Sequence, residues 1–131
     1  MGTRSLTHIA EEGETILTLY RQYDGYLEGH GLDLARFLKD ISIVNGISSN
    51  NTKIANGMGC LSAQLIAHLK DGVGNLYVYP PNSKDCWEEF TYYIYNEKLG
   101  EEVKIKVEDS RGSTIFNGTP TQLIEKANEN N

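Results

Sequence analysis

Twelve consecutive residues, YRQYDGYLEGHG at positions 20–31, hold the densest group of chemically versatile side chains in this protein. An arginine guanidinium is a planar, forked donor suited to phosphate and carboxylate groups, and tyrosine rings offer flat faces to a base or a sugar. Glycines let backbone amides approach a ligand, and the helix expected after them would have unpaired amides at its N-terminus. The stretch therefore predicts a binding site for a small anionic, nucleotide-derived ligand. The site is formed by Arg4, Arg21, Tyr23, Asp24, Tyr26, Gly29, His30 and Gly31.

Arg4 joins this predicted site through the pairing of two expected strands. The residues on either side of EEGE alternate in polarity, which is typical of a β-hairpin. A two-residue turn at 12–13 would set Arg4 opposite Arg21, and opposed like charges destabilise a sheet by up to ~1 kcal/mol unless an anion lies between them. That anion is either an internal carboxylate, such as Asp24 or Glu28, or an external ligand. A register shift of one residue would separate the two arginines.

Catalysis by the same stretch is an alternative hypothesis. A small hydrolase or transferase could use His30 or Asp24 as a general base, and His30, flanked by glycines, is expected to be exposed. The chain contains no HExxH or GxSxG sequence, no Cys–His nucleophile signature and no phosphate-binding glycine motif. We therefore assign no catalytic residue, no metal ligand and no cofactor.

A second stretch, YVYPPNSKDCWEEF, places three large aromatic residues around a proline-stiffened loop. If they are exposed, Tyr77, Tyr79 and Trp87 would form a contact surface for a protein, because tryptophan and tyrosine concentrate at interaction hot spots. If they point inward, they belong to the core. This stretch supports a third hypothesis, a protein–protein interaction module or an oligomer, and a homo-oligomer is compatible with all three.

Composition and charge exclude several classes of function. The chain has 131 residues, a net charge of -6 and a pI near 5.0, which argues against general nucleic-acid binding because that needs a basic face. Its two cysteines, Cys60 and Cys86, are too few for a disulfide framework. No run of apolar residues is long enough to span a bilayer. We expect a protein that does not associate with membranes and is located in the cytoplasm.

The pattern of elements predicts a single α+β domain over 1–131, with an antiparallel sheet of about six strands packed with three helices in the order ββααββββα. Apolar residues at helical spacing begin at Leu34, with Asp33 as the expected N-cap. A mobile loop is expected over 45–57, followed by a second helix and four strands. TPTQ predicts that Thr119 and Gln122 form a capping box at the start of the last helix.

Four segments, MGTRSLTHI, YRQYDGY, GHG before a helix and NGMGCLSAQLIAHLKDG, together resemble a group of small bacteriophage and bacterial proteins. The resemblance covers most of the first 80 residues and implies no role for any residue, because the group has no established activity. It implies a phage-type accessory protein in the host cytoplasm, and such proteins include inhibitors of host defence that sequester signalling nucleotides. We favour a non-catalytic binder of a nucleotide-derived anion over an interaction module that acts on a host protein, and both over a hydrolase.

Overall fold

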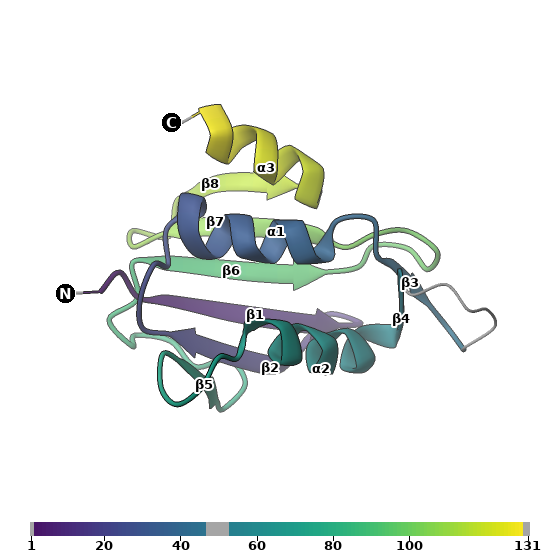
Figure 1. Cartoon of the computed structure of the whole chain (residues 1–131), viewed down its shortest axis with the longest axis horizontal. Coiled ribbons are helices and arrows are strands. Elements are labelled where there is room, and N and C mark those ends of the chain that lie inside the picture. Colours follow the sequence, from purple (N-terminus) through teal and green to yellow (C-terminus); the bar gives the residue numbers. More distant parts are fainter. Residues whose placement is uncertain (1, 47–52, 130–131) are drawn as a thin grey trace.

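The computed structural model describes residues 2–46 and 53–129, and these form a curved sheet with helices on one side (Figure 1). The six-stranded sheet has the order β5-β2-β1-β6-β7-β8, and β3 and β4 form a separate two-stranded sheet. This confirms the predicted α+β class and the six main strands. The elements are β1 (Ser5–Glu11), β2 (Glu14–Arg21), a π-helical turn (Leu27–Gly31), α1 (Leu32–Leu38), β3 (Ser42–Val44), β4 (Ile54–Asn56), α2 (Gly57–Leu69), β5 (Leu76–Tyr79), β6 (Phe90–Tyr95), β7 (Lys104–Asp109), β8 (Thr114–Gly118) and α3 (Pro120–Glu129).

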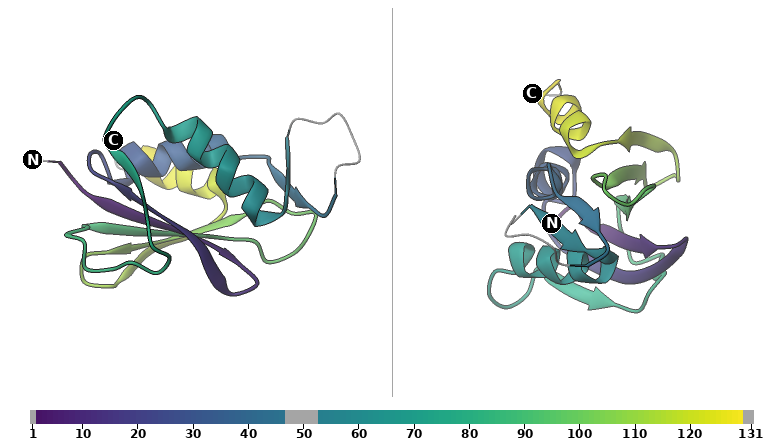
Figure 2. Two further views of the ribbon diagram at one scale, coloured as in Figure 1. Left: turned by 90° about the horizontal axis from the view of Figure 1, so that it is seen from below. Right: turned by 90° about the vertical axis from the view of Figure 1, so that its right-hand side faces the viewer.

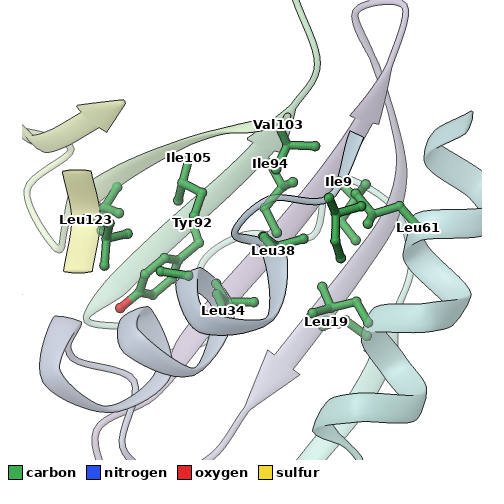
Figure 3. Close-up of a cluster of buried hydrophobic side chains, with 14 of the residues drawn as sticks. Ile9, Leu19, Leu34, Leu38, Leu61, Tyr92, Ile94, Val103, Ile105 and Leu123 are labelled. Carbon is green, nitrogen blue, oxygen red and sulfur yellow. The ribbon is translucent and has the colours of Figure 1, made fainter. Parts of the chain in front are cut away.

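The three helices cover one face of the sheet, as both views in Figure 2 show. All neighbouring strands of the six-stranded sheet are antiparallel except β1 and β6, which run parallel. The core lies between the helices and this inner face, where Ile9, Tyr92, Ile94 and Ile105 are fully buried (Figure 3). Among the described residues, no helix is both long and apolar enough to cross a membrane.

The connection between β5 and β6, residues 80–89, is here called the crossover segment. Strand β5 pairs with β2, whereas β6 pairs with β1, so the chain must pass across β2 and β1 to reach β6. The amide of Asn82 in this segment donates to the Thr18 hydroxyl at 3.1 Å. Leu6 and His8, which alternate with the core residues of β1, are also buried. The crossover segment therefore covers part of the outer face of the sheet, the face opposite the helices.

The register of the first hairpin differs from the predicted one. A β-bulge interrupts the β1–β2 ladder, so Ala10 pairs with Thr15 but Ile9 pairs with Leu17. The additional residue, Ile16, shifts every later pair by one position, and Ser5 rather than Arg4 lies opposite Arg21. The predicted pairing of the two arginines is therefore wrong. Sequence alternation alone does not locate a bulge, and one inserted residue changes the face on which each partner lies.

Two expectations about the helical region also need correction. Asp33 lies inside the first turn of α1 rather than at its N-cap, because the π-helical turn runs directly into the helix. Part of the expected loop at 45–57 is a strand, since β4 pairs in parallel with β3, and α2 begins at Gly57. Residues 47–52 of that predicted loop lie outside the described residues.

The start of α3 confirms the predicted capping box. The Thr119 hydroxyl accepts the Gln122 amide at 3.2 Å, and the Gln122 side-chain oxygen accepts the Thr119 amide at 2.9 Å. Pro120 is the first helical residue, where its missing N–H leaves no hydrogen bond unmade. This local signal depends on four consecutive residues, and the tertiary fold leaves it unchanged.

Candidate functional site

The side chain of Arg21 is enclosed by partners from the protein itself. Its Nη1 contacts His30 Nδ1 at 3.1 Å and Asp33 Oδ2 at 3.3 Å, and its Nε donates to the backbone oxygen of Tyr23 at 2.8 Å. Only 16% of the Arg21 side chain is exposed. Of the two explanations for an anion beside Arg21, the geometry favours an internal carboxylate, and that carboxylate is Asp33.

His30 is fully buried, so the expectation that it is exposed is wrong. Its Nε2 lies 2.8 Å from the Thr7 hydroxyl, and its ring meets the Tyr92 ring edge-on at 4.9 Å between centroids. Because arginine only donates, His30 Nδ1 must accept from Arg21, which leaves the proton on Nε2 to be donated to Thr7. The sequence of contacts Asp33–Arg21–His30–Thr7 thus connects α1, β2, the π-helical turn and β1.

Burial, followed by the positive charge of Arg21, lowers the pKa of His30 from 6.5 to about 3. The imidazole is therefore neutral at physiological pH and has no contact with solvent. A general base must reach its substrate, and this one lies beneath the turn that carries it. The geometry accordingly favours a structural role for His30 over a role as general base, while the exposed Asp24 stays the other predicted base of the hydrolase hypothesis.

The glycines of the predicted site serve close packing inside the protein. A Cβ atom added at Gly25 would lie 2.8 Å from Ser5 Cβ, and one at Gly29 would lie 2.5 Å from the Asp24 oxygen. The amides of the loop are also engaged: Gly29 and Gly31 donate to the Tyr26 oxygen, and His30 donates to the Asp24 oxygen. These amides stabilise the turn and are not directed toward an open site.

The remaining predicted ligand residues lie near the surface. Tyr23 and Tyr26 are 48% and 38% exposed, and the Tyr26 hydroxyl donates to Asp24 Oδ1 at 3.2 Å. That hydrogen bond, together with the negative charge of Asp24, raises the pKa of Tyr26. Arg4 is half-buried, and no described residue forms a hydrogen bond or ion pair with its side chain. The structure brings Arg21, His30 and Asp24 together but leaves Arg4 outside this group.

The predicted interface residues have three different environments. Tyr79 stacks on Tyr20 with ring centroids 4.9 Å apart and planes inclined by 7°. Tyr77 is 44% exposed and packs obliquely against the same Tyr20 ring. Trp87, on the crossover segment, is 85% exposed, more than any aromatic residue of the predicted ligand loop. We call these three residues, Tyr77, Tyr79 and Trp87, the aromatic surface.

The outer face of the sheet holds a second buried histidine, His8, whose ring stacks on Tyr93 at 5.3 Å between centroids. A cavity of about 310 Å³ opens beside it, lined in part by Glu88 and Glu108. A larger cavity of about 610 Å³ lies at the end of β1, around Glu11 and Gly57. Neither cavity is lined by a residue of the predicted ligand site. Within residues 2–46 and 53–129, no group of three or more His, Cys, Asp or Glu side chains is arranged to hold a metal ion.

Sequence reasoning missed the residues that complete these two environments. Thr7 and Tyr92 enclose His30, but their residue types alone are typical of any half-buried strand. The alternation of β1 could have indicated that His8 and Thr7 lie on opposite faces. Nothing local to the sequence indicates that the crossover segment covers one of those faces, because that depends on the order of strands in the sheet.

Comparisons with known proteins identify no relative of this chain. No protein-family model matches it, and no curated protein and no solved structure gives a significant match.

Proposed function

We propose that the protein is a non-catalytic binding protein that recognises a protein partner through the aromatic surface of Tyr77, Tyr79 and Trp87. The observation that supports this most directly is the 85% exposure of Trp87, the only tryptophan in the chain. An exposed indole leaves a large apolar area in contact with water. Residues of this type contribute most of the binding free energy at protein interfaces.

The loop that presents Trp87 has a defined conformation. The Glu88 carboxylate accepts the amides of Cys86 at 2.6 Å and of Asp85 at 3.3 Å. Asn82, Asp85 and Trp87 all have positive φ angles, which asparagine and aspartate adopt readily but which are unfavourable for the bulky Trp87. Such strain persists only where surrounding contacts impose it, and it concentrates at binding and catalytic sites. A pre-organised loop also loses less conformational entropy when it binds.

The aromatic surface lies next to the sheet edge formed by β5, and Cys86 lies near enough to Tyr79 to affect its ionisation. Burial makes the largest contribution to raising the pKa of Tyr79, and the neighbouring Tyr20, Cys86 and Tyr77 raise it further. Cys86 of the crossover segment therefore lies near Tyr79 of β5, and Trp87 follows Cys86 in the chain. The charged residues around these aromatic rings are Asp85, Glu88 and Glu89 on the acidic side and Lys84 and Lys70 on the basic side, with Lys70 Nζ 5.7 Å from the Tyr77 ring centroid. The excess of carboxylates favours a partner with basic side chains.

A second copy of the chain is a less suitable occupant of the aromatic surface. The excess of carboxylates on one copy would face that on the other, and the whole chain has a net charge of -6. The edge of β5 also offers few free groups for strand pairing: Lys70 Nζ donates to the Leu76 oxygen at 2.8 Å, the Leu76 amide donates to Gly74, and Pro80 has no amide proton. The homo-oligomer thus stays a prediction, separate from the proposed surface.

The anionic-ligand hypothesis also stays a prediction, with a specific requirement. A phosphate at Arg21 would have to displace Asp33 from the guanidinium, in a region that also contains the carboxylates of Asp24 and Glu28. The resemblance-based context, a phage-type inhibitor of host defence, is compatible with either kind of binder. In the function proposed here, the target of such an inhibitor is a host protein.

The single tryptophan provides a direct test. Peptides selected from a displayed random library on the immobilised protein are synthesised and titrated while Trp87 fluorescence is recorded. We expect a blue shift and protection from acrylamide quenching, because binding removes the indole from water. Trp87→Ala should weaken the selected peptide by at least about tenfold, measured by calorimetry, as is typical of a hot spot.

Tyr23→Ala is the matched control, since it removes another exposed aromatic ring from the predicted ligand loop. Peptides that bind Trp87→Ala as tightly as the wild type, or a library that gives no specific peptide, would contradict the proposed surface. Loss of binding in Tyr23→Ala alone would move the contact site to the loop. A thermal-shift screen with nucleotides and cyclic nucleotides, run in parallel, tests the anionic-ligand prediction independently.

A further inference from the structure

The 310 Å³ cavity on the outer face is formed by parts of the chain that are distant in sequence. Its lining includes His8 and Tyr93 from neighbouring strands, Asp85 and Glu88 from the crossover segment, and Asp109 from the end of β7. A volume of this size is at the lower end of the range for ligand pockets, about 300–1,000 Å³. The cavity shares the crossover segment with Trp87.

The charge of the lining is strongly unbalanced. Asp85, Glu88, Glu108 and Asp109 contribute four carboxylates, whereas Lys84 is the one basic residue of this lining. Lys106 lies 3.4 Å from Glu108 and offsets its charge in part, and Arg111 lies 3.8 Å from Asp109. Among the residues that the structure describes, the Glu88 carboxylate accepts only neutral backbone amides and forms no ion pair with a cation. The electrostatic potential inside the cavity therefore favours a positively charged group.

His8 provides a second, independent indication that the cavity accepts a ligand. It is only 6% exposed, and its Nδ1 lies 2.8 Å from the Thr18 hydroxyl. The other ring nitrogen, Nε2, has no hydrogen-bond partner among the described residues, although the imidazole lines the cavity. Because the Thr18 hydroxyl can either donate to or accept from Nδ1, Nε2 can offer its lone pair to a donor in the cavity.

We propose that this cavity binds the guanidinium or ammonium group of an arginine or lysine side chain that belongs to the partner. This inference rests on the proposed function, since the partner docks on the aromatic surface beside the cavity. The long cationic side chain enters between the crossover segment and the β7–β8 turn. Its N–H groups donate to the carboxylates of Glu88 and Asp109 and to His8 Nε2.

The test uses two small probes of the same shape, N-acetyl-argininamide and N-acetyl-citrullinamide, which differ in charge. Each is titrated into the ¹⁵N-labelled full chain, and the side-chain nitrogen signals of His8 are followed by NMR. We expect the arginine probe to cause saturable shifts and to hold His8 in the tautomer protonated on Nδ1. The citrulline probe should bind at least about tenfold more weakly, because it lacks the charge that the carboxylates attract.

Charge-removing variants locate the site. Glu108→Gln retains an acceptor for the Tyr93 hydroxyl, which now donates to Glu108 at 3.1 Å, and Glu88→Gln retains an acceptor for the Cys86 amide. Each should weaken the arginine probe by about fivefold or more. Glu125→Gln removes the same charge from an exposed position on α3, which lies on the helix side of the sheet, opposite the face that holds the cavity, and should have no effect. Circular dichroism confirms that each variant is folded.

Three results would overturn the proposal: no saturable shift with the arginine probe, equal binding of the citrulline probe, or equal binding by Glu88→Gln, Glu108→Gln and the wild type. The Trp87→Ala variant separates this proposal from the proposed function, because it should leave the small probe unaffected. If the probe fails to bind while Trp87→Ala still weakens a selected peptide, the aromatic surface stands and the cation site falls. If the probe binds but Trp87→Ala has no effect on peptides, the cation site stands and the aromatic surface falls.

Discussion

The neutral, buried His30 predicts a specific dependence of stability on pH. Its pKa is lowered to about 3 in the folded protein, by burial and by Arg21, whereas an unfolded histidine has a pKa near 6.5. Below about pH 6.5 the unfolded chain therefore binds a proton that the folded protein does not bind. Stability is complete above this value and is lost as the pH falls toward 3.

The magnitude follows from linkage. One proton taken up only by the unfolded state lowers the free energy of unfolding by roughly 1.4 kcal/mol for each pH unit below 6.5. From about pH 7.5 to about pH 5.0, His30 alone should reduce that free energy by ~2 kcal/mol, a large part of the 5–15 kcal/mol typical of a domain. This interval lies above the usual carboxylate pKa values, so acidic residues contribute little to the change.

The assay is urea unfolding followed by far-UV circular dichroism at several pH values, since Trp87 is already exposed in the folded state and would report unfolding poorly. The matched variant is His30→Gln, whose amide can accept from Arg21 and donate to Thr7 without titrating. We expect this variant to be less stable at neutral pH, because it loses the ring packed against Tyr92, but to lose about 2 kcal/mol less on acidification.

His8 requires its own control, because burial lowers its pKa while Glu88 and Glu108 act in the opposite direction. Its effect on stability has the same sign as that of His30, and His8→Gln measures it separately. If wild type and His30→Gln lose the same free energy between about pH 7.5 and pH 5.0, His30 titrates as it does in the unfolded chain. That result would refute the buried Thr7–His30–Arg21 arrangement.

Two further predictions concern the stability of local structure. Thr119→Ala should lower the free energy of unfolding by about 1 kcal/mol, because it removes the hydroxyl that caps α3, while Thr119→Ser should be nearly neutral in the same urea titration. Gly25→Ala and Gly59→Ala should have opposite effects on the thermal midpoint. A Cβ at Gly25 would lie 2.8 Å from Ser5 Cβ and should destabilise the fold, whereas Gly59 has no atom within 4 Å of such a Cβ, so alanine should stabilise α2 by roughly 0.5–1 kcal/mol. Equal effects of the two alanines would contradict the close contact assigned to Gly25.

How much of the fold the sequence predicts depends on the range of the interactions involved. The capping box at Thr119 is predicted correctly, because hydrogen bonds within one helical turn determine it. The register of the first hairpin is not predicted correctly, because the bulge at Ile16 depends on how β1 and β2 pack against the rest of the sheet. The parallel pairing of β1 with β6 joins residues about 85 positions apart, and no local pattern specifies it.

For the candidate site too, the sequence predicts local features but not contacts between distant residues. The residue types in YRQYDGYLEGHG correctly indicated that an arginine needs an anion and that glycines mark close approach. They did not indicate whether the partner comes from the protein or from outside. Asp33 was predicted as a helix cap, yet the extension of the helix by the π-helical turn moves it inside α1 and directs its carboxylate to Arg21. Asp33, predicted as a helix cap, is thus the anion that pairs with Arg21, the role that the sequence had left open between an internal carboxylate and an external ligand.

The polar groups on the two faces of β1 have different roles. On the inner face, Thr7, His30 and Arg21 satisfy one another beneath the helices, so their polar groups stabilise the fold and have little left to offer a ligand. On the outer face, His8 Nδ1 contacts the Thr18 hydroxyl, and Nε2 has no hydrogen-bond partner within residues 2–46 and 53–129. His8 lies beside a cavity lined by carboxylates and near a loop that leaves Trp87 exposed to water. Buried polar groups are normally paired, and among the described residues Ser5 Oγ is the one buried side-chain nitrogen or oxygen atom without a hydrogen-bond partner. A large exposed aromatic ring such as that of Trp87 is unfavourable unless it has a use. Trp87 lies on the crossover segment and His8 lies directly beneath that segment, which is why binding is assigned to this face and not to the loop in which the sequence concentrates its tyrosines and glycines.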